Sequence, residues 1–526
     1  MTPKYLLTGA LTLGLLLFSS CASDKADASE KRIEMAKLRD KIRGGWAGQM
    51  IGVSFGAPTE FRHLQKIIEG PLPEWNPERL RNSLNQDDLY VDMTFAQVLD
   101  DKGLDATTMD FGNMLRDAKY RLWHANLAAR RALRRGVSPM ESGTPKYNSH
   151  ANDIDFQIEA DFVGLMAPGL PQSSNDICYR AGRVMNEGDG ILGGMFVSAM
   201  YSAAFFENDP LKVVEAGLAA IPAKSEYAQV IADVIRWHKE KPGDWKWNWQ
   251  QIQDKWDRDE PCPAGALLPF NIDAKLNGAY IVLGMLYGEG DMGKTLDIST
   301  RAGQDSDCNP ASAAGVLGVM LGYDSIPNEW KNGIDAIANE KFAYTNYSLN
   351  SIVDSTEKRA VALVERTGGR RDGDTLVVKT EQPKAMDIPL WNDYGKPVER
   401  VSVFDKRWSF KGPWTDVVES SDKRKSASKA GAEASVEFEG TGVILVGTYL
   451  QSVRAGTAEV YVDGKLAATV DVSSDEEKDA KGQESIYHDF NLAPGKHTLK
   501  LVVLGKPHGD SKASDVYLND IVVFRK

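Results

Sequence analysis

The sequence predicts two domains of different fold class, an all-α domain followed by an all-β sandwich of jelly-roll type. Up to about residue 366, apolar residues recur with the period of helices. After the charged, Gly-rich segment TGGRRDGD (367–374) that period ends, and short strand-like runs separated by turns follow. A chain of 526 residues is long enough for several domains of this kind.

The domain boundaries are placed where the composition changes. We expect a signal peptide over 1–21, a tether over 22–34, the helical domain over 35–366, a linker over 367–397 and the sandwich over 398–526. The residues just after position 21 are small and polar, as in a flexible tether.

Four segments illustrate the helical pattern. The stretch 88–101 places its apolar residues on one helical face, whereas 193–206 is apolar nearly all round, as in a buried helix. A third helix is expected over 210–221, which opens with a proline. A fourth is expected over 310–322, with Asn309 as its N-cap and small residues that suit close packing in a core.

The C-terminal part shows strand patterns. We expect strands within the segments 434–440, 443–450, 458–472, 487–503 and 516–524. Two turns divide the longer segments, a hairpin turn at Asp463-Gly464 and a turn at Pro494-Gly495. Short strands joined by turns are typical of an antiparallel sandwich.

The N-terminus has the features of a targeting segment. Lys4 precedes an apolar stretch over 6–18, which is shorter than a membrane span. The run LFSSC (17–21) resembles a bacterial lipobox, in which the cysteine is lipidated. It predicts an outer-membrane-anchored lipoprotein, facing the periplasm or the cell surface, with Cys21 as the lipidated residue. The alternative is an ordinary secretory signal with a chance cysteine at that place.

The charge of the chain argues against a nucleic-acid partner. The net charge is −12, the pI is about 5.3, and no dense block of Lys and Arg occurs. The most basic segment, KRIEMAKLRDKIR (31–43), has acidic residues between its basic ones, so we expect a solvated helix face there. A second basic segment, HANLAARRALRRG (124–136), indicates an outer helix face, with contact to an anionic substrate as the alternative.

Three cysteines remain beyond Cys21, namely Cys178, Cys262 and Cys308. They are too few and too scattered to indicate a disulfide framework or a zinc-ligand spacing. A single bridge stays open as an alternative.

Two acidic clusters stand out, more than two hundred residues apart. Asp87 and Asp88 begin a predicted helix, and Asp305 and Asp307 lie in a turn just before another. Several ionised carboxylates brought together repel one another unless a cation lies between them, and hard oxygen ligands suit Mg²⁺, Mn²⁺ or Ca²⁺. Spacing alone favours the simpler alternative, in which each pair caps its own helix.

Three segments together resemble the ADP-ribosylglycohydrolase superfamily. They are RGGWAGQMIGVSFGAPTEF (43–61), NQDDLYVDMTF (85–95) and AGQDSDCNPASAAGVLG (302–318). Members carry a Gly-rich segment ending in glutamate, then a Thr-Asp-Asp helix start, then a Gly-Asp-x-Asp-Thr turn before a helix of small residues. All three features occur here in that order, and the resemblance extends over about 35–330.

The resemblance implies a centre of two metal ions, Mg²⁺ or Mn²⁺, with Ca²⁺ as an alternative. Its ligands would be Asp87, Asp88, Asp305 and Asp307. Glu60 matches the glutamate that lies close to the scissile bond in relatives, so Glu60 and Asp88 are the expected catalytic residues.

The chain departs from the pattern of the superfamily at several positions. Gln86 and Cys308 replace two threonines, and Gln49 stands where an aspartate is common. The loss of two hydroxyl ligands leaves the number and identity of the metal ions open. Cys308 either offers a softer ligand or fills space as a small apolar group, the simpler of the two alternatives.

Polar residues between the two clusters are candidates for substrate binding. The segment 148–169 is dense in them, and a later loop precedes the apolar helix. We expect Asn152, Asp153, Asp155, Glu159, Asp189 and Gln304 to bind sugar hydroxyls. The alternative for 148–169 is a surface helix with solvated charges.

These observations predict a metal-dependent hydrolase of an N- or O-glycosidic bond to a ribose-like or other sugar. Relatives act on ADP-ribosyl groups, whereas a lipoprotein outside the cytoplasm would meet a sugar, a nucleoside-like small molecule or a glycan. For the sandwich, carbohydrate binding is one expectation. The alternative is a non-catalytic, carbohydrate-binding surface lipoprotein with a degenerate metal site. Retention of four Asp residues argues against it, because a dead site has no electrostatic reason to keep them together.

Overall fold

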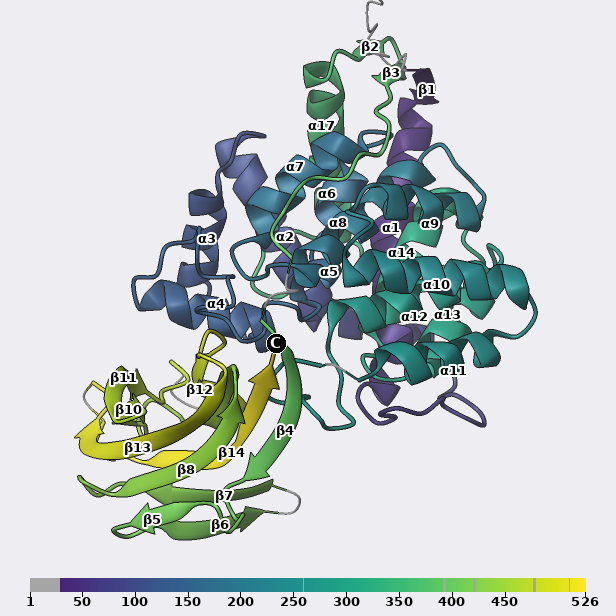
Figure 1. Cartoon of the computed structure of the whole chain (residues 1–526). Coiled ribbons are helices and arrows are strands. Elements are labelled where there is room, and N and C mark those ends of the chain that lie inside the picture. The colour runs from purple at the N-terminus through teal and green to yellow at the C-terminus, as the bar shows by residue number, and fades with distance from the viewer. Residues whose placement is uncertain (1–28, 259, 391–393, 420–421, 476–478, 510) are drawn as a thin grey trace, which may run out of the picture.

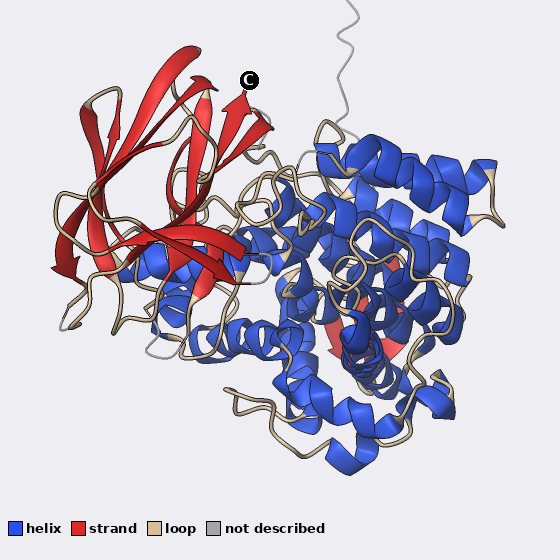
Figure 2. Cartoon of the chain, turned by 90° about the horizontal axis from the view of Figure 1, so that it is seen from below, coloured by secondary structure: helices blue, strands red, loops and turns tan. Residues whose placement is uncertain are grey.

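The computed structural model describes residues 29–526 except 259, 391–393, 420–421, 476–478 and 510. The described part consists of a helical body and a β-sandwich beside it, as the predicted fold class requires (Figures 1 and 2). Cys21, the predicted lipidation site, lies outside the described residues, as do the signal peptide and most of the tether.

The helical body runs from α1 to α17. Its longer helices are α1 (Met35–Gly56), α2 (Asp87–Lys102), α3 (Thr108–Asp117), α4 (His124–Arg134), α7 (Pro171–Gly182), α8 (Asp189–Ala204), α9 (Pro210–Ala219), α10 (Glu226–Glu240), α11 (Trp245–Trp256), α12 (Ala274–Gly288), α13 (Met292–Arg301), α14 (Cys308–Leu321) and α17 (Leu349–Arg366). The short ones are α5 (Asp155–Ile158), α6 (Asp161–Leu165), α15 (Asn328–Lys331) and α16 (Ile334–Ile337), together with the 3₁₀ turns η1 (Ala57–Thr59), η2 (Pro77–Asn85) and η3 (Tyr323–Ser325).

Each of the four illustrative helices is present, but one predicted cap is wrong. The helix expected over 310–322 begins at Cys308, so Asn309 lies inside its first turn and Asp307 takes the N-cap position. The side chain of Asn309 instead donates to the Asn277 side chain at 2.9 Å. Asn309 is buried, so its side-chain amide bonds to a neighbouring helix and does not cap its own helix.

Helices α1 and α14 pack unusually close together at the centre of the body (Figure 1). A Cβ atom on Gly48 would lie 2.1 Å from the carbonyl oxygen of Ala314, and one on Gly52 would lie 2.2 Å from that of Pro310. Only glycine permits this approach of one backbone to another. The Gly-rich segment of α1 therefore brings the C-terminal end of that helix close to the N-terminal end of α14.

A small antiparallel sheet joins the two ends of the helical body. Strand β1 (Glu30–Glu34) pairs with β3 (Thr375–Lys379), and β3 pairs with β2 (Arg370–Asp372). The segments that the sequence suggested as tether and linker thus contribute strands. The solvated helix face expected over 31–43 is wrong in part, because its first residues are in β1 and Lys41 is buried, with its ammonium donating to the carbonyl of Val319 at 2.8 Å.

The sandwich consists of two sheets with the orders β11-β10-β13-β8-β5 and β12-β9-β14-β7-β6, and β4 pairs with β14. Its strands are β4 (Lys396–Ser402), β5 (Ser409–Lys411), β6 (Thr415–Glu419), β7 (Asp422–Ala427), β8 (Glu433–Gly440), β9 (Gly442–Tyr449), β10 (Gly456–Val462), β11 (Lys465–Asp471), β12 (Lys481–Asp489), β13 (Gly495–Pro507) and β14 (Val516–Arg525). The hairpin at Asp463-Gly464 is confirmed, and both residues have positive φ, as a tight hairpin turn needs. At Pro494-Gly495 the chain instead crosses from one sheet to the other.

The sandwich packs against the helical body through apolar and charged contacts. Ala151 and Ala266 of the body join a cluster of sandwich residues that includes Phe524. The guanidinium of Arg131 in α4 lies 3.4 Å from the ring centroid of Tyr449. Arg135 pairs with Asp475 at 2.9 Å. The basic face of α4 is therefore not an outer face, because it contacts the sandwich.

Candidate functional site

A pocket of about 400 Å³ lies where α1, α2, α4, α5 and α14 meet. It is lined by Glu60, Phe61, Gln86, Asp87, Trp123, His124, Asn126, Ile154, Asp155, Ile158, Glu159, Phe270, Ile272, Asp305, Asp307 and Cys308. Carboxylates from four separate segments of the chain therefore meet in one cavity, together with an aromatic and aliphatic wall.

Local backbone contacts bring Glu60 to the second Asp cluster. Glu60 follows η1 directly after α1, and the next residue, Phe61, donates its backbone N–H to the carbonyl of Gln304 at 3.0 Å. Phe61 and Gln304 both have φ values near 50°, in the left-handed region. The Thr59 hydroxyl also lies 2.8 Å from that of Ser306. The loop carrying Glu60 is thus tied to the turn that carries Asp305 and Asp307.

The Asp residues lie at two helix N-termini that face each other. Asp87 and Asp88 begin α2, and Asp307 precedes α14. The thiol of Cys308 connects the clusters, because Sγ lies 3.5 Å from Asp88 Oδ2 and 3.9 Å from Asp307 Oδ1. Asp88 does not line the pocket and lies behind this thiol, almost fully buried.

The carboxylates of the pocket are under strong mutual repulsion. Desolvation, followed by the charges of Asp307 and Asp87, raises the pKa of Glu60 to about 8. Desolvation and Asp307 raise the pKa of Asp87 to about 6. The pKa values of Asp88 and Asp305 are raised well above their ordinary range, by burial first and then by neighbouring Asp residues. A cation among these groups would reverse the effect.

The pocket has acceptors that fit such a cation. Asp88 Oδ1 and Asp305 Oδ1 are buried and have no hydrogen-bond partner among the described residues. Oxygen atoms of Asp305 and Asp307 and the sulfur of Cys308 lie within 4.8 Å of one another. Buried charged oxygens without partners are costly, so the donor set present here suits a hard divalent ion.

The substitution at Gln49 removes one charge from this crowded region. Gln49 is buried, and its Nε2 donates to Asp161 Oδ2 at 2.6 Å. Burial raises the pKa of Asp161 to about 8. An aspartate at position 49 would add a further buried carboxylate beside Asp161, whereas the amide donates a hydrogen bond to it.

Two of the expected sugar-binding residues line the pocket. Asp155 accepts the backbone N–H groups of Ala125 and Asn126, which begin α4, at 3.2 and 2.9 Å. Glu159 accepts from the Asn126 side chain, while its Oε2 has no partner among the described residues. The segment 148–169 is buried rather than a solvated surface helix, so the alternative for it is wrong.

The other four expected sugar-binding residues lie outside the pocket lining. Asp153 contacts His150, and Asn152 Oδ1 accepts the backbone N–H of Asp189 at 3.2 Å. Asp189 in turn accepts the N–H of Tyr227, and Gln304 bonds to backbone groups of Asn271 and Pro269. Their role in binding sugar stays a prediction.

The aromatic wall of the pocket was not predicted from the sequence. The Phe61 and Phe270 rings lie 5.0 Å apart, and the His124 ring stacks on Phe270 at 5.7 Å. Trp123 completes this wall, with the ammonium of Lys481 from β12 4.5 Å from its ring centroid. The pair Trp123-His124, at the start of the arginine-rich segment 124–136, was the feature of the sequence that could have indicated this wall.

Two smaller findings concern the cysteines and the search for a membrane-spanning helix. Cys178, Cys262 and Cys308 are buried and unpaired, so the open alternative of a bridge among these three is not realised. Among the described residues, no helix combines the length and apolar character needed to cross a membrane.

The chain is similar to one protein family and to several solved structures. The sequence model of the ADP-ribosylglycohydrolase family matches residues 34–370, more than half of the chain. An ADP-ribosylglycohydrolase-related protein complex is similar over 62% of this chain and 99% of its own, with 16% identity and a TM-score of 0.39. No curated protein is similar enough to count as a match.

Two further solved structures are similar to shorter parts of the chain. One is a carbohydrate-binding module, CBM36, in complex with calcium and xylotriose, which covers 24% of this chain and 98% of its own at 12% identity, with a TM-score of 0.18. The other is a two-domain esterase active on acetylated mannans, which covers 34% of this chain and 47% of its own at 18% identity, with a TM-score of 0.21. Because the family match alone spans more than half of the chain and contains every residue that lines the carboxylate pocket, the chain belongs to the ADP-ribosylglycohydrolase family.

Proposed function

We propose that this protein is a metal-dependent hydrolase of an N- or O-glycosidic bond to a ribose-like or related sugar. The observation that carries the proposal is the meeting of Glu60, Asp87, Asp305 and Asp307 in one pocket, with Asp88 directly behind them. Membership of a glycohydrolase family supports hydrolysis in general. The sugar and the leaving group belong to the proposal.

The four Asp residues of the two clusters would hold two Mg²⁺ or Mn²⁺ ions. Their oxygen-only character favours these ions, and the buried Oδ1 atoms of Asp88 and Asp305 supply ligands that have no other partner among the described residues. When bound, such ions supply a Lewis acid that can grip vicinal hydroxyls and lower the pKa of water.

Glu60 is placed to move a proton in this reaction. It is exposed to the pocket, and without a cation desolvation and the charges of Asp307 and Asp87 raise its pKa to about 8. A cation held by the Asp residues would lower this pKa again, so that the ionised carboxylate could accept a proton from an attacking water and return it to a leaving group. Asp88 is almost fully buried, which supports a role as a metal ligand, and its predicted catalytic role stays a prediction.

The opposite wall would bind the apolar side of the substrate. Phe61, Phe270 and Trp123 present ring surfaces, and sugars and nucleobases both pack on such surfaces. Asp155 and Glu159 face the same cavity and would accept hydrogen bonds from sugar hydroxyls. This combination supports a sugar or nucleoside-like small molecule, or the end of a glycan, as the substrate.

We also propose that the enzyme acts outside the cytoplasm as a lipoprotein and that its sandwich binds carbohydrate. The support is the LFSSC run (17–21) and the presence of a second, β-sandwich domain. A Cys21→Ser variant should lose lipid labelling and membrane association. Persistence of both in the variant would contradict the lipobox.

The alternative, a carbohydrate-binding protein with a degenerate metal site, is favoured by the replacements Gln86 and Cys308, which both line the pocket. A direct test separates the two functions. Purified protein, with and without a chelator, is assayed on a panel of aryl furanosides and on ADP-ribose. We expect hydrolysis that the chelator abolishes and Mg²⁺ or Mn²⁺ restores. Sugar binding without turnover, indifferent to the chelator, would establish the alternative.

A further inference from the structure

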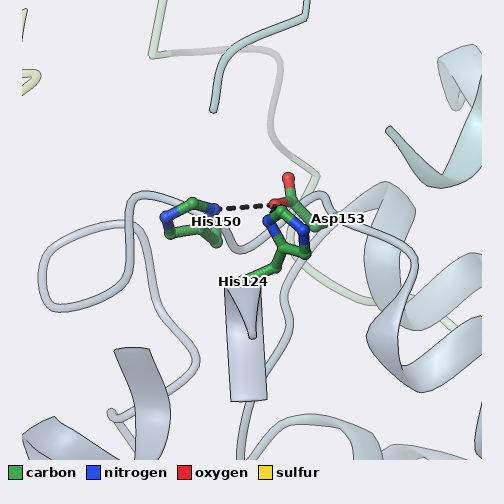
Figure 3. A group of neighbouring side chains, drawn as sticks. All are labelled: His124, His150 and Asp153. Carbon is green, nitrogen blue, oxygen red and sulfur yellow. Dashed lines mark hydrogen bonds and ion pairs between the residues drawn. The ribbon is translucent and has the colours of Figure 1, made fainter. Parts of the chain in front are cut away.

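Two histidines and a carboxylate gather at the wall of the pocket, and Figure 3 shows their three side chains together. His124 begins α4, and His150 and Asp153 lie in the segment before α5. His150 Nδ1 lies 2.7 Å from Asp153 Oδ2, and His124 Nδ1 lies 3.6 Å from the same oxygen. One donor atom from each of the three side chains lies within 4.8 Å of the other two. The three side chains therefore converge on one point.

Two donor atoms of this cluster have no hydrogen-bond partner among the described residues. They are Asp153 Oδ1 and His124 Nδ1, and both atoms are buried. The Asp153 side chain is completely buried. A buried carboxylate oxygen and a buried imidazole nitrogen without partners each carry a free-energy cost. A metal ion between them would satisfy both atoms at once.

A second group of possible donors lies on the other side of Asp153. Donor atoms of Asp153, Glu260 and Cys262 also lie within 4.8 Å of one another. Glu260 is already engaged, because its oxygens accept the backbone N–H groups of Cys262, Ile272 and Asp273 at 2.8 to 2.9 Å. Cys262 is buried, forms no disulfide and bonds to Glu260, so this second group is separate from the two histidines.

The outer side of the cluster is built as in many zinc sites. His150 Nε2 lies 3.0 Å from Glu484 Oε2, which belongs to β12 of the sandwich. Histidines that ligate a metal through one nitrogen commonly donate the other N–H to a carboxylate.

We propose that His124, His150 and Asp153 bind one divalent transition-metal ion of the zinc class, at a site separate from the four-Asp centre. Two imidazoles and a carboxylate, with a fourth position left for water, form a set of borderline softness that suits Zn²⁺ and not Mg²⁺. Binding releases the proton of His150 Nδ1 to solvent. His124 also lines the pocket, and Glu484 belongs to the sandwich, so the ion would fasten the sandwich to the pocket wall.

Cobalt substitution tests this site without any enzyme assay. The full-length protein is stripped with a chelator and titrated with Co²⁺ in excess Mg²⁺, which keeps the four-Asp centre filled. We expect one Co²⁺ per chain with the strong visible bands of a tetrahedral ion. Zn²⁺ should displace it. Asp153→Asn should remove the visible bands, whereas Cys262→Ser should leave them unchanged.

Two more variants make the result specific. Glu484→Gln removes only the outer carboxylate and should weaken binding by about 10–100-fold. Asp305→Asn alters the four-Asp centre and should leave the cobalt spectrum unchanged. Circular dichroism reports whether each variant folds. If Asp153→Asn does not fold, His124→Ala and Glu484→Gln test the site in its place. The absence of tetrahedral bands overturns the proposal, and so does a spectrum that Asp305→Asn abolishes or a cobalt affinity that His124→Ala and Glu484→Gln leave unchanged.

Discussion

The carboxylate pocket and the His124–His150–Asp153 cluster share the wall of one cavity, yet they collect their donor atoms differently. The pocket takes its oxygens from helix starts that also stand out as short motifs in the sequence. The cluster takes two histidines and an aspartate from a loop and a helix start, and it receives its outer carboxylate from another domain. Hard oxygens are concentrated in the first and nitrogen donors in the second. The comparison teaches that donor chemistry, more than location, separates the two sites.

The substitution Asp305→Asn should have the largest effect. Only the pocket should be affected. The amide keeps the shape of the side chain but removes a buried charged ligand, so turnover should fall below detection and Mg²⁺ should no longer raise the melting temperature. Metal-dependent turnover and thermal melting check this. The matched control is Asp254→Asn, the same change at an exposed position of α11, which should behave as the unmodified protein. Normal turnover in Asp305→Asn would remove this residue from the metal site.

The substitution Glu60→Gln should separate chemistry from metal binding. The amide cannot transfer a proton, so kcat should fall by about 10²–10⁴-fold if Glu60 is the general base. Mg²⁺ should still bind, because Glu60 is not one of the four Asp ligands. Single-turnover kinetics and Mg²⁺ titration of the melting temperature measure the two effects. Unchanged kcat would exclude Glu60 from the proton transfer.

The substitution Gly52→Ala tests whether the pocket depends on the close approach of α1 to α14. The added Cβ would lie 2.2 Å from the carbonyl oxygen of Pro310, so the helices must separate. Overpacking of this kind costs about 1–3 kcal/mol of stability. Mg²⁺ binding should weaken, while cobalt binding at the histidine cluster stays. The control Gly243→Ala adds a Cβ with no neighbour within 4 Å and should change neither.

The pH dependence of stability should reveal the repulsion among the carboxylates. The pKa of Glu60 rises from its ordinary 4.5 to about 8 in the folded protein. A raised pKa gives stability that is fully present below pH 4.5 and is lost as the pH rises through about 8. Metal-free protein should therefore lose melting temperature relative to Glu60→Gln across this range, and Mg²⁺ should reduce the difference. Parallel melting curves for the two proteins at all pH values would contradict the shift.

The substitution Cys308→Thr should have the smallest effect. It restores the hydroxyl that the superfamily motif carries after its second Asp, beside Asp88 and Asp307. We expect Mg²⁺ affinity to rise by less than about tenfold, or 1.4 kcal/mol. Calorimetric titration measures this change. A loss of affinity would show that the sulfur is a better partner for the metal than the hydroxyl.

Much of the fold was predictable because it depends on local patterns. The hairpin at Asp463-Gly464 follows from two residues that accept positive φ, and α2 follows from apolar spacing and an acidic first turn. Features that depend on distant partners were not predictable in the same way. The sheet pairs β1 with β3, more than three hundred residues later, and the amide of Asn309 is taken by Asn277 of another helix.

The sequence by itself determined the family, the division into helical and β parts, and the four Asp residues and Glu60 as the acidic motifs. Each of these features depends on a short run of residues whose properties act locally. Only the tertiary structure decided that Glu60 would meet Asp307, because that contact depends on the approach of α1 to α14 along their whole length. It also decided that His150 would lie between Asp153 and Glu484, three hundred residues further along the chain. The physical reason is that packing across domains brings together groups whose separation in sequence carries no information about their distance in space.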